Sequence, residues 1–181
     1  MTKTLRLGAA GIAMFAAMGL NTAAHADTAA ADATAEVLAA LELTNTDALN
    51  FGTIVVSATS TGGTVDVDVA GARTCAGDIV CGPAGAEQAA GFTVVGTAGA
   101  DVSVTVQDLV ANPVSLTHTA NVGSTSAAHN IELTALVDSA GGSFVGFSGS
   151  EDFTVGGTIS LDGSEIAGTY EGTFDVTVAY Q

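Results

Sequence analysis

Residues 168–180 read GTYEGTFDVTVAY, and this stretch decides the fold class. Every second position is glycine, aliphatic or aromatic: Gly168, Tyr170, Gly172, Phe174, Val176, Val178 and Tyr180. The positions between them are mostly polar: Thr169, Glu171, Thr173, Asp175 and Thr177, followed by Ala179. A helix would mix the two sets around its surface, whereas a strand places them on opposite faces. The stretch therefore predicts a β-strand with one buried face.

The same alternation recurs along the chain, between glycine-rich turns. It predicts strands over Thr64–Val69, Phe92–Gly96, Asp101–Gln107, Ile131–Asp138 and Val155–Leu161. Several short strands separated by turns favour two packed antiparallel sheets over an α/β fold. We therefore expect an all-β protein with an immunoglobulin-like antiparallel β-sandwich.

The first 26 residues predict a signal peptide. Lys3 and Arg6 precede an apolar run from Leu7 to Leu20, and the small-x-small pattern Ala24-His25-Ala26 follows it. The run is shorter than the roughly 20 residues of a membrane-spanning helix. We expect cleavage after Ala26, which leaves 155 of the 181 residues, and no membrane insertion after cleavage. That length suits one domain.

The charge of the mature chain rules out several partners. Arg73 is its only Lys or Arg, and the chain has 19 acidic residues, which gives a formal charge of −18. Nucleic-acid binding requires cations that neutralise phosphates, so we expect no nucleic-acid partner. A chain without Lys also cannot form a Schiff base. The charge favours solubility and repulsion between separate copies.

The two cysteines predict a local disulfide. Cys75 and Cys81 are separated by five residues, and an exported chain meets an oxidising compartment. Two thiolates with no neighbouring histidine do not make a four-ligand zinc site, and the spacing is not that of a C-x-x-C redox motif. The sequence therefore favours a structural bond.

No set of residues specifies catalysis. Gly146 to Ser150 fails the G-x-S-x-G pattern at its last position. His118 and His129 lie in a polar stretch that is typical of a loop, so we expect two exposed loop histidines rather than a general base. We expect a non-enzymatic protein without a cofactor.

Two acidic pairs raise the question of calcium. Asp66 and Asp68 share one face of a predicted strand, and Glu151 and Asp152 are adjacent in a predicted Gly/Ser loop. Calcium requires six to eight converging oxygens, usually from a tight loop with alternating acidic residues, and no such loop is present. A solvated strand face and a polar loop explain the pairs better.

The segment after the signal peptide also alternates. Ala31, Ala33, Ala35 and Val37 fall in one phase and polar residues in the other. We interpret residues 27–38 as an extension and residues 39–181 as the sandwich domain, whose first strand lies near Ala39–Leu43. Helix propensity is also high here, so a short helix and a strand paired within its own domain remain alternatives.

Four motifs in order resemble one family of bacterial exported proteins, domain-of-unknown-function family 4402. They are LNFGTI at 49–54, GFTVVG at 91–96, VGGTI at 155–159 and the closing strand at 168–180. The closing strand is also similar to that of spore-coat-U and archaic chaperone–usher pilins, which end in a Tyr-rich alternating strand with a penultimate Tyr.

This resemblance implies an incomplete immunoglobulin-like fold that a neighbour's extension completes by adding a strand. The implied donor residues are Ala31, Ala33, Ala35 and Val37, and the implied groove strand carries Tyr170, Phe174, Val176, Val178 and Tyr180. We therefore expect a subunit of a surface fibre, such as a fimbria, in a Gram-negative bacterium. Its expected partners are copies of itself or related subunits, a periplasmic chaperone and an outer-membrane usher. A monomeric secreted or periplasmic binding module is the alternative.

Overall fold

The structure is a computed structural model that describes residues 27–181. The chain divides into two units, one ending at Glu36 and one spanning Val37–Gln181. In the first unit, residues 27–36 are exposed and form no regular secondary structure. The predicted signal peptide, residues 1–26, lies outside the described residues. Every strand among the described residues lies in the second unit.

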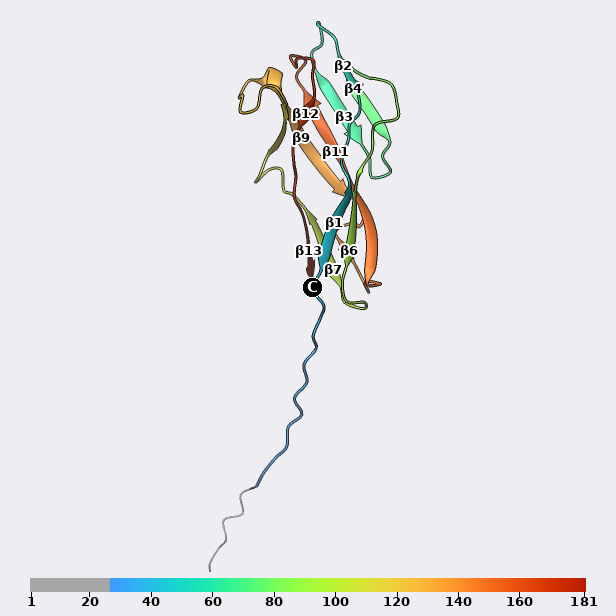
Figure 1. Cartoon of the computed structure of the whole chain (residues 1–181), viewed down its shortest axis with the longest axis vertical. Helices are drawn as coiled ribbons and strands as arrows, with labels where there is room; N and C mark the ends of the chain where they lie inside the picture. The colour runs from blue at the N-terminus through green and yellow to red at the C-terminus, as the bar shows by residue number, and fades with distance from the viewer. Residues whose placement is uncertain (1–26) are drawn as a thin grey trace, which may run out of the picture. The chain divides into compact units, whose positions relative to one another are not determined.

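The second unit is all-β, and its chain order is shown by colour in Figure 1. Its elements are β1 (Glu42–Asp47), β2 (Ile54–Val56), β3 (Gly63–Val67), β4 (Arg73–Gly77), β5 (Ile79–Cys81), β6 (Ala90–Val95), β7 (Val102–Val106), β8 (Val114–His118), the 3-10 helix η1 (Ala127–His129), β9 (Asn130–Asp138), β10 (Ser143–Phe144), β11 (Ser150–Leu161), β12 (Tyr170–Glu171) and β13 (Val176–Tyr180). Across residues 27–181 there is no helix long and apolar enough to cross a membrane.

The long strand β11 organises the larger sheet, whose order is β1-β6-β11-β9-β8-β12. Its first half pairs with β6 and its second half with β3, while β9 pairs along its other edge. Gly156 and Gly157 lie where these halves meet. A Cβ at Gly156 would lie 2.5 Å from the carbonyl oxygen of Val67, so glycine permits this close approach of the two backbones.

The smaller sheets complete the sandwich. One has the order β10-β7-β13, and the other pairs β2 with β5. All strand pairs within the described residues are antiparallel, as the sequence predicted. The protein is an antiparallel β-sandwich.

Two apolar clusters fill its interior. The first lies under β2, β3 and β12 and consists of Phe51, Val65, Val67, Ile79, Val114, Ile131, Leu133, Ile159 and Leu161. The second lies between β6, β7 and β11 and consists of Ala90, Phe92, Val94, Val102, Val104, Phe147, Phe153 and Val155. The rings of Phe92 and Phe153 stack there at 5.3 Å between centroids. Leu49, Leu136 and Phe174 pack against both clusters and so link them.

Most predicted strands are confirmed, with shifted ends. The closing stretch differs because it forms two strands, β12 and β13, interrupted at residues 172–175. The interruption coincides with the loop between β7 and β8, the strands with which β13 and β12 pair. The predicted first strand near Ala39–Leu43 begins later, at Glu42, and continues to Asp47.

Two predictions about polar residues are wrong. Glu151 and Asp152 are not in a loop but in β11, where the Thr93 hydroxyl donates to Asp152 Oδ1 at 2.6 Å. His118 is not an exposed loop residue but ends β8 with 7% of its surface exposed. In both cases pairing with a neighbouring strand places the polar residues within the sheet.

Candidate binding groove

The first and last strands of the sandwich each leave one edge without a partner. β1 pairs with β6 alone, and β13 pairs with β7 alone, so within residues 27–181 both are outer strands of their sheets. β1 and β13 are drawn beside each other in Figure 1, near the C-terminus. Unpaired edges of this kind expose backbone donors and acceptors to a further strand.

The hydrogen bonds of β13 show which of its backbone groups are free for such a strand. The backbone N–H of Gln107 donates to the backbone carbonyl oxygen of Asp175 at 2.9 Å, and that of Gln181 donates to the backbone carbonyl oxygen of Asp101 at 3.0 Å. In an antiparallel ladder, alternate residues point their N–H and C=O groups to opposite sides. The backbone groups of Val176, Val178 and Tyr180 therefore point away from β7, toward the open edge.

At the C-terminal end the two edges are held close by the Tyr180 hydroxyl. It donates to the Ala39 oxygen at 2.9 Å and accepts from Thr97 N at 2.7 Å. Ala39 N in turn donates to Thr97 Oγ1 at 2.7 Å. Leu41 and Leu43 pack against the same core cluster as Val176 and Val178. The chain that leads into β1 is thus fastened beside the end of β13.

At the other end of the sandwich a groove of about 910 Å³ lies between the segment that follows β1 and the segment that precedes β13. One wall, which we call the N-terminal wall, consists of residues 48–56. The other, the C-terminal wall, consists of residues 165–172. The floor is apolar and belongs to the first core cluster: Leu116, Ile131, Ile159 and Leu161. Val55 and Ile166, one on each wall, are 49% and 41% exposed, so apolar surface here faces solvent.

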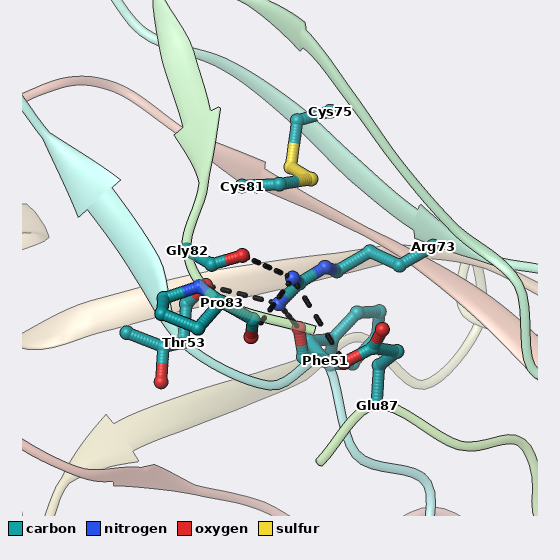
Figure 2. The surroundings of a disulfide bond; sticks show 8 residues. All are labelled: Phe51, Thr53, Arg73, Cys75, Cys81, Gly82, Pro83 and Glu87. Atoms are coloured by element: carbon teal, nitrogen blue, oxygen red, sulfur yellow. Dashed lines mark hydrogen bonds and ion pairs between the residues drawn. A yellow bond between two sulfur atoms is a disulfide. The ribbon is translucent and has the colours of Figure 1, made fainter. Parts of the chain in front are cut away.

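Arg73 holds the N-terminal wall in place, as Figure 2 shows. Its Nη1 donates to the carbonyl oxygens of Phe51 at 3.0 Å and Thr53 at 2.9 Å, and its Nη2 donates to that of Gly82 at 2.8 Å. Glu87 lies 3.9 Å from Nη2, and the Arg73 side chain is only 4% exposed. A planar guanidinium donates in several fixed directions at once, which suits this junction of loops.

The Glu87 carboxylate is itself held by several donors. Backbone N–H groups, its own and that of Gly85, lower the pKa of Glu87, and the charge of Arg73 adds to this. Sequence reasoning used Arg73 only to count charge. Its being the single cation of the mature chain was the one available signal of a structural role.

The predicted disulfide between Cys75 and Cys81 is present and lies beside this junction (Figure 2). The two Cα atoms are 5.7 Å apart, and the bond joins β4 to β5. β5 pairs with β2, which belongs to the N-terminal wall, through Ile54↔Cys81 and Val56↔Ile79. The disulfide therefore supports the N-terminal wall indirectly, through β5 and its pairing with β2. Bonds of this kind form in oxidising compartments, which is compatible with an exported protein.

The C-terminal wall is held by neutral groups. The Tyr170 hydroxyl lies 2.8 Å from both the Ala128 and the Ile166 carbonyl oxygens, and Tyr170 pairs with His118 across β12 and β8. The His118 ring meets the Tyr170 ring edge-on at 5.2 Å. Burial raises the pKa of the Tyr170 phenol, and the negative charge of Glu165 adds to this.

The two nitrogens of His118 have separate partners. Ala120 N donates to Nδ1 at 3.1 Å, so the proton of the neutral ring lies on Nε2, which is 3.3 Å from the Ala167 oxygen. His118 thereby links β8 to the C-terminal wall. Sequence reasoning missed this role, because a polar stretch contains no signal of burial.

The predicted groove residues and the predicted donor residues differ in burial. Tyr170, Phe174, Val176, Val178 and Tyr180 are all half-buried, but of the five only Tyr170 lines the groove; the other four pack against the second core cluster. Ala31, Ala33 and Ala35 are exposed and in no regular structure, and Val37 is 89% exposed. In the single chain the extension forms neither the alternative helix nor a strand paired within its own domain, and its role as a donor strand stays a prediction.

The acidic pairs considered for calcium have other partners. Asp66 accepts from the Thr158 hydroxyl at 2.7 Å, and Asp68 accepts from Ala70 N and Ala72 N at 2.8 Å each, which closes the turn before β4. Across the described part of the chain, no three His, Cys, Asp or Glu side chains are grouped so as to hold a metal ion.

Comparison with known proteins identifies the domain. No curated protein matches the chain. A family model described as "Domain of unknown function (DUF4402)" matches residues 41–180, from the residue before β1 to the last residue of β13. The match spans both open edges and the groove between them, and it begins after the extension. The chain therefore belongs to the DUF4402 family.

Proposed function

We propose that this protein is a structural subunit of an exported surface fibre, in which the extension of one copy completes the sandwich of the next. The observation that carries this proposal is the pair of unpaired edges, β1 and β12–β13, next to a groove with an apolar floor between the N-terminal and C-terminal walls. A strand placed there would gain backbone hydrogen bonds and cover apolar surface that now faces solvent.

The direction of the two edges suits a single inserted strand. β1 runs from the C-terminal end toward the groove, whereas β12 and β13 run from the groove back to the C-terminal end. A strand between them is therefore parallel to one edge and antiparallel to the other. The backbone groups of Val176, Val178 and Tyr180, which point to the open side, are available to pair with it.

The extension has the pattern that this position requires. Its alternate residues Ala31, Ala33, Ala35 and Val37 would face the core, and its polar residues would face solvent. These residues are exposed in the single chain, so their apolar side chains gain from burial in a partner. Alanine side chains are small, which leaves part of the groove volume to be filled by wall movement.

Several features follow from this role. The protein acts without catalysis or a cofactor, after export by a signal peptide in a Gram-negative cell. Its partners are copies of itself or related subunits, and a periplasmic chaperone and an outer-membrane usher carry it to the surface. An open apolar edge requires such a chaperone, because it would otherwise pair with unrelated strands.

The test is the polymeric state of the secreted protein. Deleting residues 27–37 should abolish the ladder of heat-sensitive oligomers on unheated denaturing gels, because inserted strands dissociate slowly. A matched pair of variants sharpens the test. Ala35→Asn places an amide toward the core and should weaken the ladder, whereas Thr34→Asn changes the solvent face and should leave it intact. An unchanged ladder after the deletion would reject the proposal.

A monomeric binding module is the second candidate, favoured by the existence of an apolar groove in a single chain. It predicts one species in both heated and unheated gels, and the same thermal stability with and without residues 27–37. The unheated denaturing gel thus separates the two candidates, because the fibre subunit gives a ladder and the monomeric module gives a single species.

A further inference from the structure

The solvent face around the open edges carries only negative charge. Glu171 on β12 and Asp175 before β13 alternate with the core-facing Tyr170, Phe174 and Val176, so their side chains lie on the opposite, exposed face. On the other edge, Glu42 alternates with the core-facing Leu43 in the same way. Within residues 27–181, none of these three carboxylates has a hydrogen-bond or ion-pair partner.

The extension brings charge of the same sign. When Ala31, Ala33 and Ala35 face the core, Asp32 and Glu36 face solvent, beside the carboxylates of the receiving edges. Like charges on directly opposed strand positions are destabilising. The apolar side of the extension offers little to offset this, since three of its four core-facing residues are alanines.

No cation is available to compensate. Arg73 is the only Lys or Arg beyond residue 26, and it is 4% exposed and bonded to carbonyl groups of the N-terminal wall. Each approaching copy also carries a formal charge of −18 after the predicted cleavage. Counter-ions must therefore come from the solution.

We propose that strand exchange between copies of this chain is restrained by like charge at Glu42, Glu171 and Asp175 against Asp32 and Glu36, and that dissolved salt controls it. This inference rests on the proposed function and adds its regulation. At 0.01 M salt, screening extends over about 30 Å, so whole copies repel one another; at 0.1 M it falls to about 10 Å. Assembly is therefore weak in dilute medium and strong in saline medium.

The test uses a labelled peptide with the sequence of residues 27–37 and a neutral counterpart with Asp32→Asn and Glu36→Gln. Each is titrated, in 10 mM and 300 mM NaCl, against the chain that begins at Leu38, which keeps both receiving edges and has no extension to compete with the peptide. The native peptide should bind about tenfold more tightly at the higher salt, and the neutral peptide should change by less than about twofold. The neutral peptide also reports any effect of salt on apolar contacts, since the apolar residues are the same.

Variants of the receiving chain give an independent readout. At 10 mM NaCl, Glu171→Gln should raise the affinity for the native peptide about threefold and leave the affinity for the neutral peptide unchanged. Glu132→Gln is the matched control, because Glu132 is an exposed carboxylate on β9, away from both open edges, and it should change neither affinity.

The outcomes separate this inference from the proposed function. Binding of both peptides with the same salt dependence would overturn the charge restraint and leave strand exchange standing. Binding of neither peptide at either salt concentration would overturn strand exchange, and the charge restraint with it.

Discussion

The two walls of the groove are built from different interactions. The N-terminal wall, residues 48–56, is held by a buried guanidinium that binds three carbonyl groups on two segments of the chain, with a disulfide one strand away. The C-terminal wall, residues 165–172, is held to the rest of the sandwich by neutral groups: one hydroxyl, one imidazole, backbone bonds at Ile166 and Thr169, and a two-residue pairing of β12 with β8. Its one carboxylate with such bonds, Glu165, accepts from Asp162 N and Gly163 N in the same segment. Charged and covalent links cost more to break than neutral hydrogen bonds. The C-terminal wall is thus the one that can yield when a strand enters.

The largest expected effect is at Arg73. Arg73→Ala should lower the free energy of unfolding by about 4 kcal/mol, because it leaves several carbonyl groups and Glu87 without their donor. Urea denaturation measures this loss. Arg73→Lys should recover only part of it, since an ammonium cannot reach the carbonyls of Phe51, Thr53 and Gly82 together. A loss below about 1 kcal/mol for Arg73→Ala would mean that the N-terminal wall does not depend on this side chain.

The disulfide should contribute less. Replacing both Cys75 and Cys81 with serine should lower the free energy of unfolding by about 2 kcal/mol, because the loop that the bond closes is short. Urea denaturation of the oxidised protein, the reduced protein and the double variant measures the loss. The reduced protein and the variant should agree. If reduction costs as much as Arg73→Ala, the ranking of supports within the N-terminal wall is reversed.

The smallest effect should come from the C-terminal wall. Tyr170→Phe should cost about 1 kcal/mol, the value of a neutral hydrogen bond. The folded state raises the pKa of Tyr170 above the ordinary value of about 10, so the stability contributed by the protonated phenol is present below pH 10 and is lost as the pH rises further. Thermal unfolding between pH 8 and about 11 measures this decline. The decline should be shallower in Tyr170→Phe, and equal slopes in both proteins would contradict the assignment.

Sequence patterns predicted the parts of this fold that rest on alternation. β3, β6, β7, β9 and β11 each bury one face, so period-two patterns reveal them. The disulfide was predicted from the expected oxidising compartment and the cysteine count. The strands β4 and β5 were not predicted, because they are short and are stabilised by the disulfide and by neighbouring strands rather than by an alternating pattern of their own.

The walls of the groove were only half predictable. The open edge at Tyr170, Phe174 and Val176 follows the closing alternation, but the facing residues 48–56 contain only three residues in a strand and take their shape from Arg73. A long-range contact between one arginine and carbonyl groups carries no local sequence signal. The burial of His118 was missed for the same reason, since its partners are backbone atoms near residue 167 and at Ala120.

The Tyr180 hydroxyl has a practical consequence for anyone who labels this protein. Because it ties the end of β13 to Ala39 and Thr97, and Gln181 N still bonds to Asp101, affinity tags or fluorescent fusions appended to the C-terminus would crowd the point where the chain enters the domain. The loops at Val110 and Val122, which are 95% and 81% exposed, are better insertion points for a reporter.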